Sequence, residues 1–97
     1  MTYNLEYIPT FYTDVLQVIN NLEEYPQKSK RVFSKLDKIL NNLVDMPEMY
    51  PVYEDLPIFR KITVEDYLAF YIINKQDRHI EVHRLLHGKT NIPEQLM

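Results

Sequence analysis

An arginine and two histidines end the last apolar stretch of the chain. His83, Arg84 and His87 lie in segment 79–87, HIEVHRLLH, which also carries four aliphatic residues. An imidazole can transfer protons near neutral pH, and a guanidinium can stabilise negative charge on a phosphate. These residue types therefore allow acid–base chemistry at a bound phosphate, with Arg84 as a phosphate-binding group and His87, or a tyrosine, as the proton-transfer group.

Two further cations occupy an earlier strand-like segment. Arg60 and Lys61 are neighbours in segment 58–63, IFRKIT. Successive residues of a strand point to opposite faces of the sheet, so one of the two could share a face with Arg84. Arg60 and Lys61 are therefore also candidate catalytic residues.

An ordinary structural role explains the same residues. Arginine is rarely buried without a partner, so Arg84 could pair with an acid such as Glu81 or Glu65. His87 would then only cap the end of the sheet. Spacing alone leaves both interpretations open.

The histidines do not predict a metal site within one strand. His79, His83 and His87 are spaced four residues apart, which is roughly 13 Å in a strand, whereas zinc holds its ligands at ~2 Å. A site that borrows ligands from a neighbouring strand stays open. Since the chain has no cysteine and one glycine, it lacks Cys-based zinc sites and glycine-rich phosphate loops. We expect no metal and no cofactor.

Length and composition indicate one small globular domain over residues 1–97. The chain is 45% hydrophobic, with a net charge of −3. It has no signal peptide pattern and no apolar run of the ~18 residues that would span a membrane, so we expect a cytoplasmic protein with no membrane partner. A basic run, 28–38, favours the solvated face of a helix, and the acidic balance disfavours non-specific nucleic-acid binding.

The hydrophobic periodicity predicts an α+β fold in the order β-α-α-β-β-β. A helix hairpin should cover one face of a small, mainly antiparallel sheet. The expected elements are a strand at 3–8, a helix from Pro9 that Thr10 can cap and Pro26 ends, a helix at 27–45, a loop at 46–57, and strands at 58–63, 67–73 and 79–87.

The middle strand of the predicted sheet has two apolar faces. Leu68, Phe70 and Ile72 suit the helix-covered face, which leaves Tyr67 and Tyr71 on an open face. An open face lined with phenols suits a ligand or partner, and we expect His83 to lie there as well. Alternatively, the tyrosines are half-buried rim residues.

Two segments together carry a resemblance to a known family. The C-terminal IEVHRLLHGKTNIPEQL, residues 80–96, is similar to the pattern V-x-V-x-R-x-x-H-G-x-x-(D/N)-(I/L)-P, and FRKITVEDYLAFYII, residues 59–73, looks like the preceding strands. The chain resembles the RelE/ParE superfamily of bacterial type II toxins over nearly its whole length.

This resemblance implies a growth-inhibiting toxin that a cognate antitoxin neutralises. RelE-like members cleave mRNA on the ribosome (mRNA interferases), whereas ParE-like members poison DNA gyrase without nuclease activity. Arg84 matches the last-strand arginine of the family, and His87 matches the terminal His or Tyr of the cleaving members. Arg60 and Lys61 fall near basic positions, but Tyr67 stands where many cleaving members carry arginine.

Three functions follow as expectations from the resemblance. The first is a ribosome-dependent mRNA endoribonuclease, the second a gyrase inhibitor, and the third a degenerate member that only binds its antitoxin. In all three, we expect the antitoxin to contact exposed tyrosines and the grooves of the helix hairpin.

Overall fold

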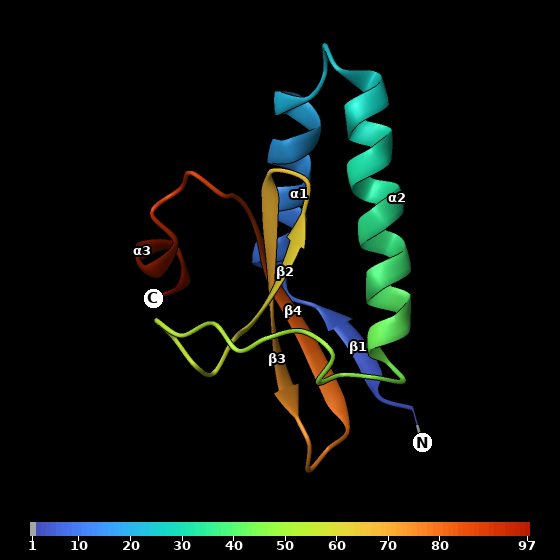
Figure 1. Ribbon diagram of the computed structural model, residues 1–97, viewed down its shortest axis with the longest axis vertical. Coiled ribbons are helices and arrows are strands. Elements are labelled where there is room, and N and C mark those ends of the chain that lie inside the picture. The colour runs from blue at the N-terminus through green and yellow to red at the C-terminus, as the bar shows by residue number, and fades with distance from the viewer. Residues whose placement is uncertain (1) are drawn as a thin grey trace.

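The computed structural model describes residues 2–97 and confirms the order β-α-α-β-β-β, with a short helix added at the C-terminus (Figure 1). The predicted bounds differ from the observed ones by up to four residues. The elements are β1 (Asn4–Tyr7), α1 (Pro9–Asn21), α2 (Pro26–Leu43), β2 (Arg60–Val64), β3 (Tyr67–Asn74), β4 (His79–His87) and α3 (Ile92–Leu96). Within residues 2–97, no helix is both long and apolar enough to cross a bilayer.

The four strands form one mixed sheet in the order β1-β4-β3-β2. β2, β3 and β4 pair antiparallel through short turns, whereas β1 pairs parallel with β4. The chain between the parallel strands β1 and β4 runs through the helix hairpin and then through β2 and β3. β1 joins the sheet of the last three strands, at the edge beside β4.

The two long helices begin at prolines and cover one face of the sheet (Figure 1). Pro9 and Pro26 occupy the first helical turn, where a missing N–H costs nothing. Thr10 does not cap α1 as predicted, because its hydroxyl donates instead to the His83 carbonyl at 2.8 Å.

The predicted assignment of the two faces of β3 is wrong. Tyr67 and Tyr71 are 4% and 0% exposed and pack in the main core beneath the helices, whereas Phe70 points to the other side. The Tyr71 hydroxyl donates to the Pro47 carbonyl at 2.7 Å, which satisfies the buried phenol. The alternating pattern was correct, but both sets of residues are apolar enough to be buried.

The other face of the sheet is not open, because a second apolar cluster covers it. Its buried members are Phe59, Phe70, Leu86 and Ile92. The loop before β2 and the C-terminal α3 supply the covering side chains, on the side away from the long helices (Figure 1). The prediction of an open sheet face lined by tyrosines is therefore wrong, because this face is covered and the tyrosines lie on the other one.

Side chains of α1 complete the free edge of β4. β1 pairs only with residues 79–82 of β4. A β-bulge follows in β4: Val82 pairs with Tyr71 and Arg84 pairs with Phe70, so His83 has no partner residue on β3. Beyond β1, Thr10 bonds the His83 carbonyl. Further along the strand, the Asp14 carboxylate accepts from the Leu85 N–H at 2.9 Å. α1 thus satisfies backbone groups that a longer strand would otherwise pair.

Asp14 also forms a bidentate ion pair with Arg84. The Arg84 Nε lies 2.7 Å from Asp14 Oδ2, and Nη2 lies 3.1 Å from Oδ1. Arg84 Nη1 donates to the Gln95 carbonyl at 2.5 Å. The side chains of Asp14 and Arg84 are 12% and 19% exposed, so the pair joins α1, β4 and α3 in a largely desolvated position.

Asp14→Asn should destabilise the protein by about 2 kcal/mol, because it leaves the guanidinium of Arg84 without its counter-charge. Urea unfolding of both proteins measures the difference. Glu48→Gln is the matched control, since the Glu48 side chain is 54% exposed and its loss should leave the midpoint almost unchanged. Equal midpoints for Asp14→Asn and the control would contradict this role of the pair.

Tyr71 should give the fold a sensitivity to high pH. Burial raises the pKa of the Tyr71 phenol to about 12, although the nearby Arg60 guanidinium opposes the shift. Its contribution to stability is therefore present below about pH 10 and is lost as the pH rises towards 12. In chemical unfolding measured at several pH values, the free energy of unfolding of Tyr71→Phe should fall less between pH 10 and 12 than that of the wild type. That of Tyr25→Phe, at an exposed position, should not.

Candidate functional site

The structure divides the four candidate catalytic residues between the two faces of the sheet. Lys61 and Arg84 both pair with Phe70, in one row on the face of the second cluster. Arg60 pairs with Tyr71 and His87 with Tyr67, in two rows on the helix-covered side. Those two rows are four residues apart along β3, which is roughly 13 Å. The four side chains therefore do not converge on one point.

Arg84 already has its partners inside the fold. Asp14 and Gln95 accept hydrogen bonds from its guanidinium. The structure therefore agrees with the second interpretation of Arg84, in which the arginine is held by an ion pair. The acid is Asp14 and neither Glu81 nor Glu65. The sequence held a signal for it, because Asp14 shares a helical face with the buried Phe11 and Val18, and a charge on a buried face needs a partner.

Arg60 holds the loop before β2. Its Nη1 donates to the Tyr50 carbonyl at 2.7 Å, and its Nη2 lies 3.9 Å from a Glu48 carboxylate oxygen. The side chain is 21% exposed. Arg60 therefore orders the loop.

Lys61 has fewer side-chain partners than Arg60 or Arg84. Its Nζ lies 5.9 Å from the centre of the Tyr53 ring, and within residues 2–97 it forms no ion pair with an acid. Two strand spacings, about 10 Å, separate its backbone from that of Arg84. The buried Phe70 lies between them.

His87 lies at the end of β4 with one ring nitrogen engaged. Its Nδ1 accepts from the Lys89 N–H at 3.1 Å, and its ring stands edge-on to Tyr67 at 5.3 Å between centroids. Gly88 follows, and its N–H donates to the Asp66 carbonyl at 2.8 Å. A Cβ at Gly88 would lie 3.2 Å from that oxygen, so the glycine permits close contact with the β2–β3 turn.

Glu65 and Asp66 of this turn neutralise much of the basic run in α2, whereas the sequence suggested Glu65 as a partner of Arg84 and predicted no role for Asp66. Asp66 pairs with Lys28, and Glu65 pairs with Lys35 at 2.6 Å and Arg31 at 3.3 Å. The hydrogen bond from Lys28 holds the pKa of the Asp66 carboxyl below its usual range. Hydrogen bonds from Lys35 and Arg31 do the same for the pKa of Glu65.

His83, predicted to face a ligand or partner, lies on the face of the second cluster. Its Nε2 is 3.1 Å from a Glu81 carboxylate oxygen, and its ring meets Phe59 edge-on at 5.4 Å. The side chain is 25% exposed. Tyr67 and Tyr71 do not join it, because they point into the core beneath the helices.

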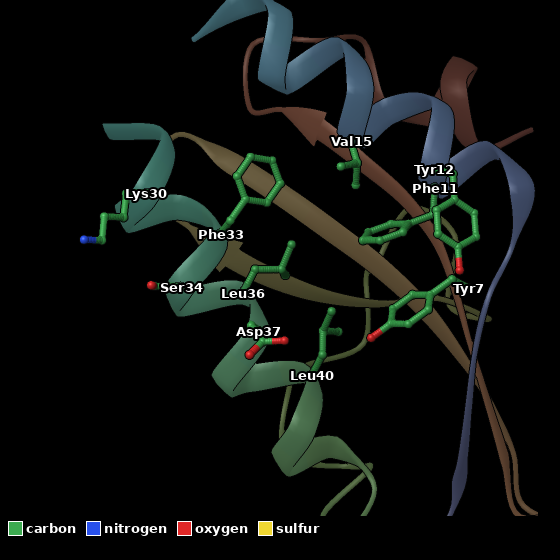
Figure 2. Close-up of a pocket in the computed structure, with 10 residues that line it drawn as sticks. All are labelled: Tyr7, Phe11, Tyr12, Val15, Lys30, Phe33, Ser34, Leu36, Asp37 and Leu40. Carbon is green, nitrogen blue, oxygen red and sulfur yellow. The ribbon is translucent and has the colours of Figure 1, made fainter. Parts of the chain in front are cut away.

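A groove of about 620 Å³ opens between α1, α2 and the end of β1 (Figure 2). Tyr7 stacks on Phe11 at 5.3 Å, and Tyr12 meets Tyr7 edge-on at 5.9 Å. Polar groups reach the groove from α2. Its lining comprises Tyr7, Phe11, Tyr12, Val15, Phe33, Leu36 and Leu40, with Lys30, Ser34 and Asp37 as the polar members. A helix-hairpin groove is thus present, with an apolar lining suited to an amphipathic segment.

Comparison with known proteins gives the family. Residues 5–92 match the family model described as the ParE toxin of the type II toxin–antitoxin system parDE. No curated protein sequence matches the chain.

Solved structures share the fold at low identity. A chain of the chromosomal ParDE system of P. aeruginosa is 13% identical, with a TM-score of 0.72 and coverage of 91% of this chain and 98% of that one. A chain of the RelBE2 toxin–antitoxin complex of Mycobacterium tuberculosis is 16% identical, with a TM-score of 0.64 and coverage of 90% and 99%. The isolated E. coli RelE toxin is 13% identical, with a TM-score of 0.65 and coverage of 97% and 94%.

The family match spans nearly the whole chain, and the fold agrees with it. The chain therefore belongs to the ParE toxin family, and is a type II toxin of the RelE/ParE superfamily.

Proposed function

We propose that this toxin inhibits growth by binding its target, DNA gyrase, as ParE-like members do, and that it does not cleave mRNA. The observation that carries the proposal is the bidentate pairing of Arg84 with Asp14. Cleavage of a phosphodiester requires cations aimed at the developing negative charge. The arginine that matches the family position is instead neutralised within the fold.

Freeing Arg84 for a phosphate would be costly. Removing a guanidinium from a largely buried ion pair leaves its partner charge, Asp14, uncompensated. Asp14 would also repel the incoming phosphate from the same position. His87 lies on the opposite face of β4, so it could not transfer a proton to a group held at Arg84.

The surface charge also favours a protein target. Three cations of α2 are paired with Glu65 and Asp66, and the whole chain has a net charge of −3. Entry into the ribosome requires unpaired positive charge to neutralise RNA phosphates. A surface that binds another protein does not need unpaired positive charge.

The cognate antitoxin is the second partner that we propose. The groove between α1 and α2 presents aromatic and aliphatic side chains, with Asp37 of α2 beside them (Figure 2). An amphipathic tail that folds on binding would bury its apolar face there. Toxin–antitoxin complexes among the structural neighbours support such a partner.

The purified toxin should inhibit DNA supercoiling by gyrase and should leave mRNA intact on programmed ribosomes. His87→Ala should change the inhibitory concentration by less than about twofold, because a proton-transfer group has no role in binding. Site-specific mRNA cleavage that is lost in His87→Ala would establish the nuclease instead. Inhibition in neither assay by folded toxin would indicate a member that only binds its antitoxin.

Tyr12→Ala should weaken antitoxin binding at least about tenfold, because it removes an aromatic side chain from the groove. Titration calorimetry with the cognate antitoxin measures this change. Leu16→Ala is the matched control, since both residues are exposed on α1 (56% and 63%) but Leu16 does not line the groove. Equal affinity of the two variants would exclude the groove as the antitoxin site.

A further inference from the structure

Two glutamates and two histidines lie together where β1 meets β4. Glu6 belongs to β1, and His79, Glu81 and His83 alternate along β4. They project from the sheet face opposite the long helices, because the residues between them pack in the helix-covered core. None of the residues that line the proposed antitoxin groove belongs to this cluster.

The side chains of three members converge closely. His79 Nε2 lies 2.8 Å from a Glu6 carboxylate oxygen and 4.0 Å from a Glu81 carboxylate oxygen. One ligand atom from each of the three lies within 4.8 Å of the other two. One strand alone spaces its histidines too far apart to share an ion, but the parallel pairing supplies Glu6 from the neighbouring strand.

The cluster also carries a charge that the fold does not compensate. The register places Glu6 directly opposite Glu81, and like charges opposite one another on neighbouring strands are destabilising. Among residues 2–97, neither glutamate forms an ion pair with lysine or arginine. Their partners are the two histidines, so no lysine or arginine offsets the two opposed carboxylates.

We propose that Glu6, His79 and Glu81 form a binding site for a divalent cation of the zinc class. A tetrahedral ion with bonds of ~2.0–2.2 Å holds its ligand atoms roughly 3.3 Å apart. The observed separations of 2.8 and 4.0 Å bracket this value, so small side-chain rotations bring the ligands to the ion. An imidazole beside carboxylates favours zinc over magnesium or calcium, which prefer oxygen ligands.

His83 would act outside the coordination shell. Its Nε2 lies 3.1 Å from Glu81 Oε1, whereas Glu81 Oε2 is the oxygen nearer His79. A hydrogen bond from His83 would orient the Glu81 carboxylate toward the ion. The ion would join the short edge strand β1 to β4 and so stabilise the folded state by mass action.

Titration calorimetry of tag-free toxin with zinc chloride tests the site near neutral pH. We expect one ion per chain and a higher unfolding temperature, with no such rise on adding magnesium at the same concentration. His79→Gln and Glu81→Gln should each weaken binding at least about tenfold. His87→Gln is the matched control, because it removes the one histidine outside the cluster and should leave the affinity unchanged.

Glu6→Gln separates a metal ligand from a structural residue. Without zinc, this variant should be at least as stable as the wild type, because it removes one of the two opposed charges. It should nevertheless lose most of the stabilisation by zinc. The absence of zinc binding to the folded wild type, or unchanged affinity in His79→Gln and Glu81→Gln, would overturn the proposal.

Discussion

The pairing of Asp14 with Arg84 is the constraint on which the rest of the structure depends. β1 is too short to satisfy the whole edge of β4, so α1 must supply acceptors and donors beyond residue 82. The same carboxylate that binds the Leu85 N–H fixes the guanidinium, which in turn holds the C-terminal segment at Gln95. Arg84 is thereby part of the scaffold, since its guanidinium joins α1, β4 and the C-terminal segment.

The order of elements was predictable because each has a local cause. Helical spacing of apolar residues, prolines at the two helix starts and alternation in the last three strands all point to the same layout. The faces of β3 were not predictable in the same way. Both sets of its side chains are apolar, and only the position of the covering loop and of α3 determines which lies beneath the helices.

The site was harder to predict than the fold because its contacts join distant residues. Arg84 meets an acid 70 positions away, and Lys28 meets one 38 positions away, so local spacing predicted neither pair. The same limit applies to Glu6, which reaches His79 only through a parallel register. Asp14 on a buried helix face was the one local signal of these contacts. The family match shows which family the chain belongs to.

The most direct test of the central claim is the exchange rate of the Arg84 Nε proton, observed by ¹⁵N NMR in the free toxin. An Nε–H held by Asp14 should exchange slowly with water and keep its chemical shift when inorganic phosphate or a short RNA is added. In Asp14→Asn, the protection should be lost. A rapidly exchanging Nε–H in the wild type, or a large shift on adding RNA, would show that Arg84 is free to bind phosphate and would contradict the account.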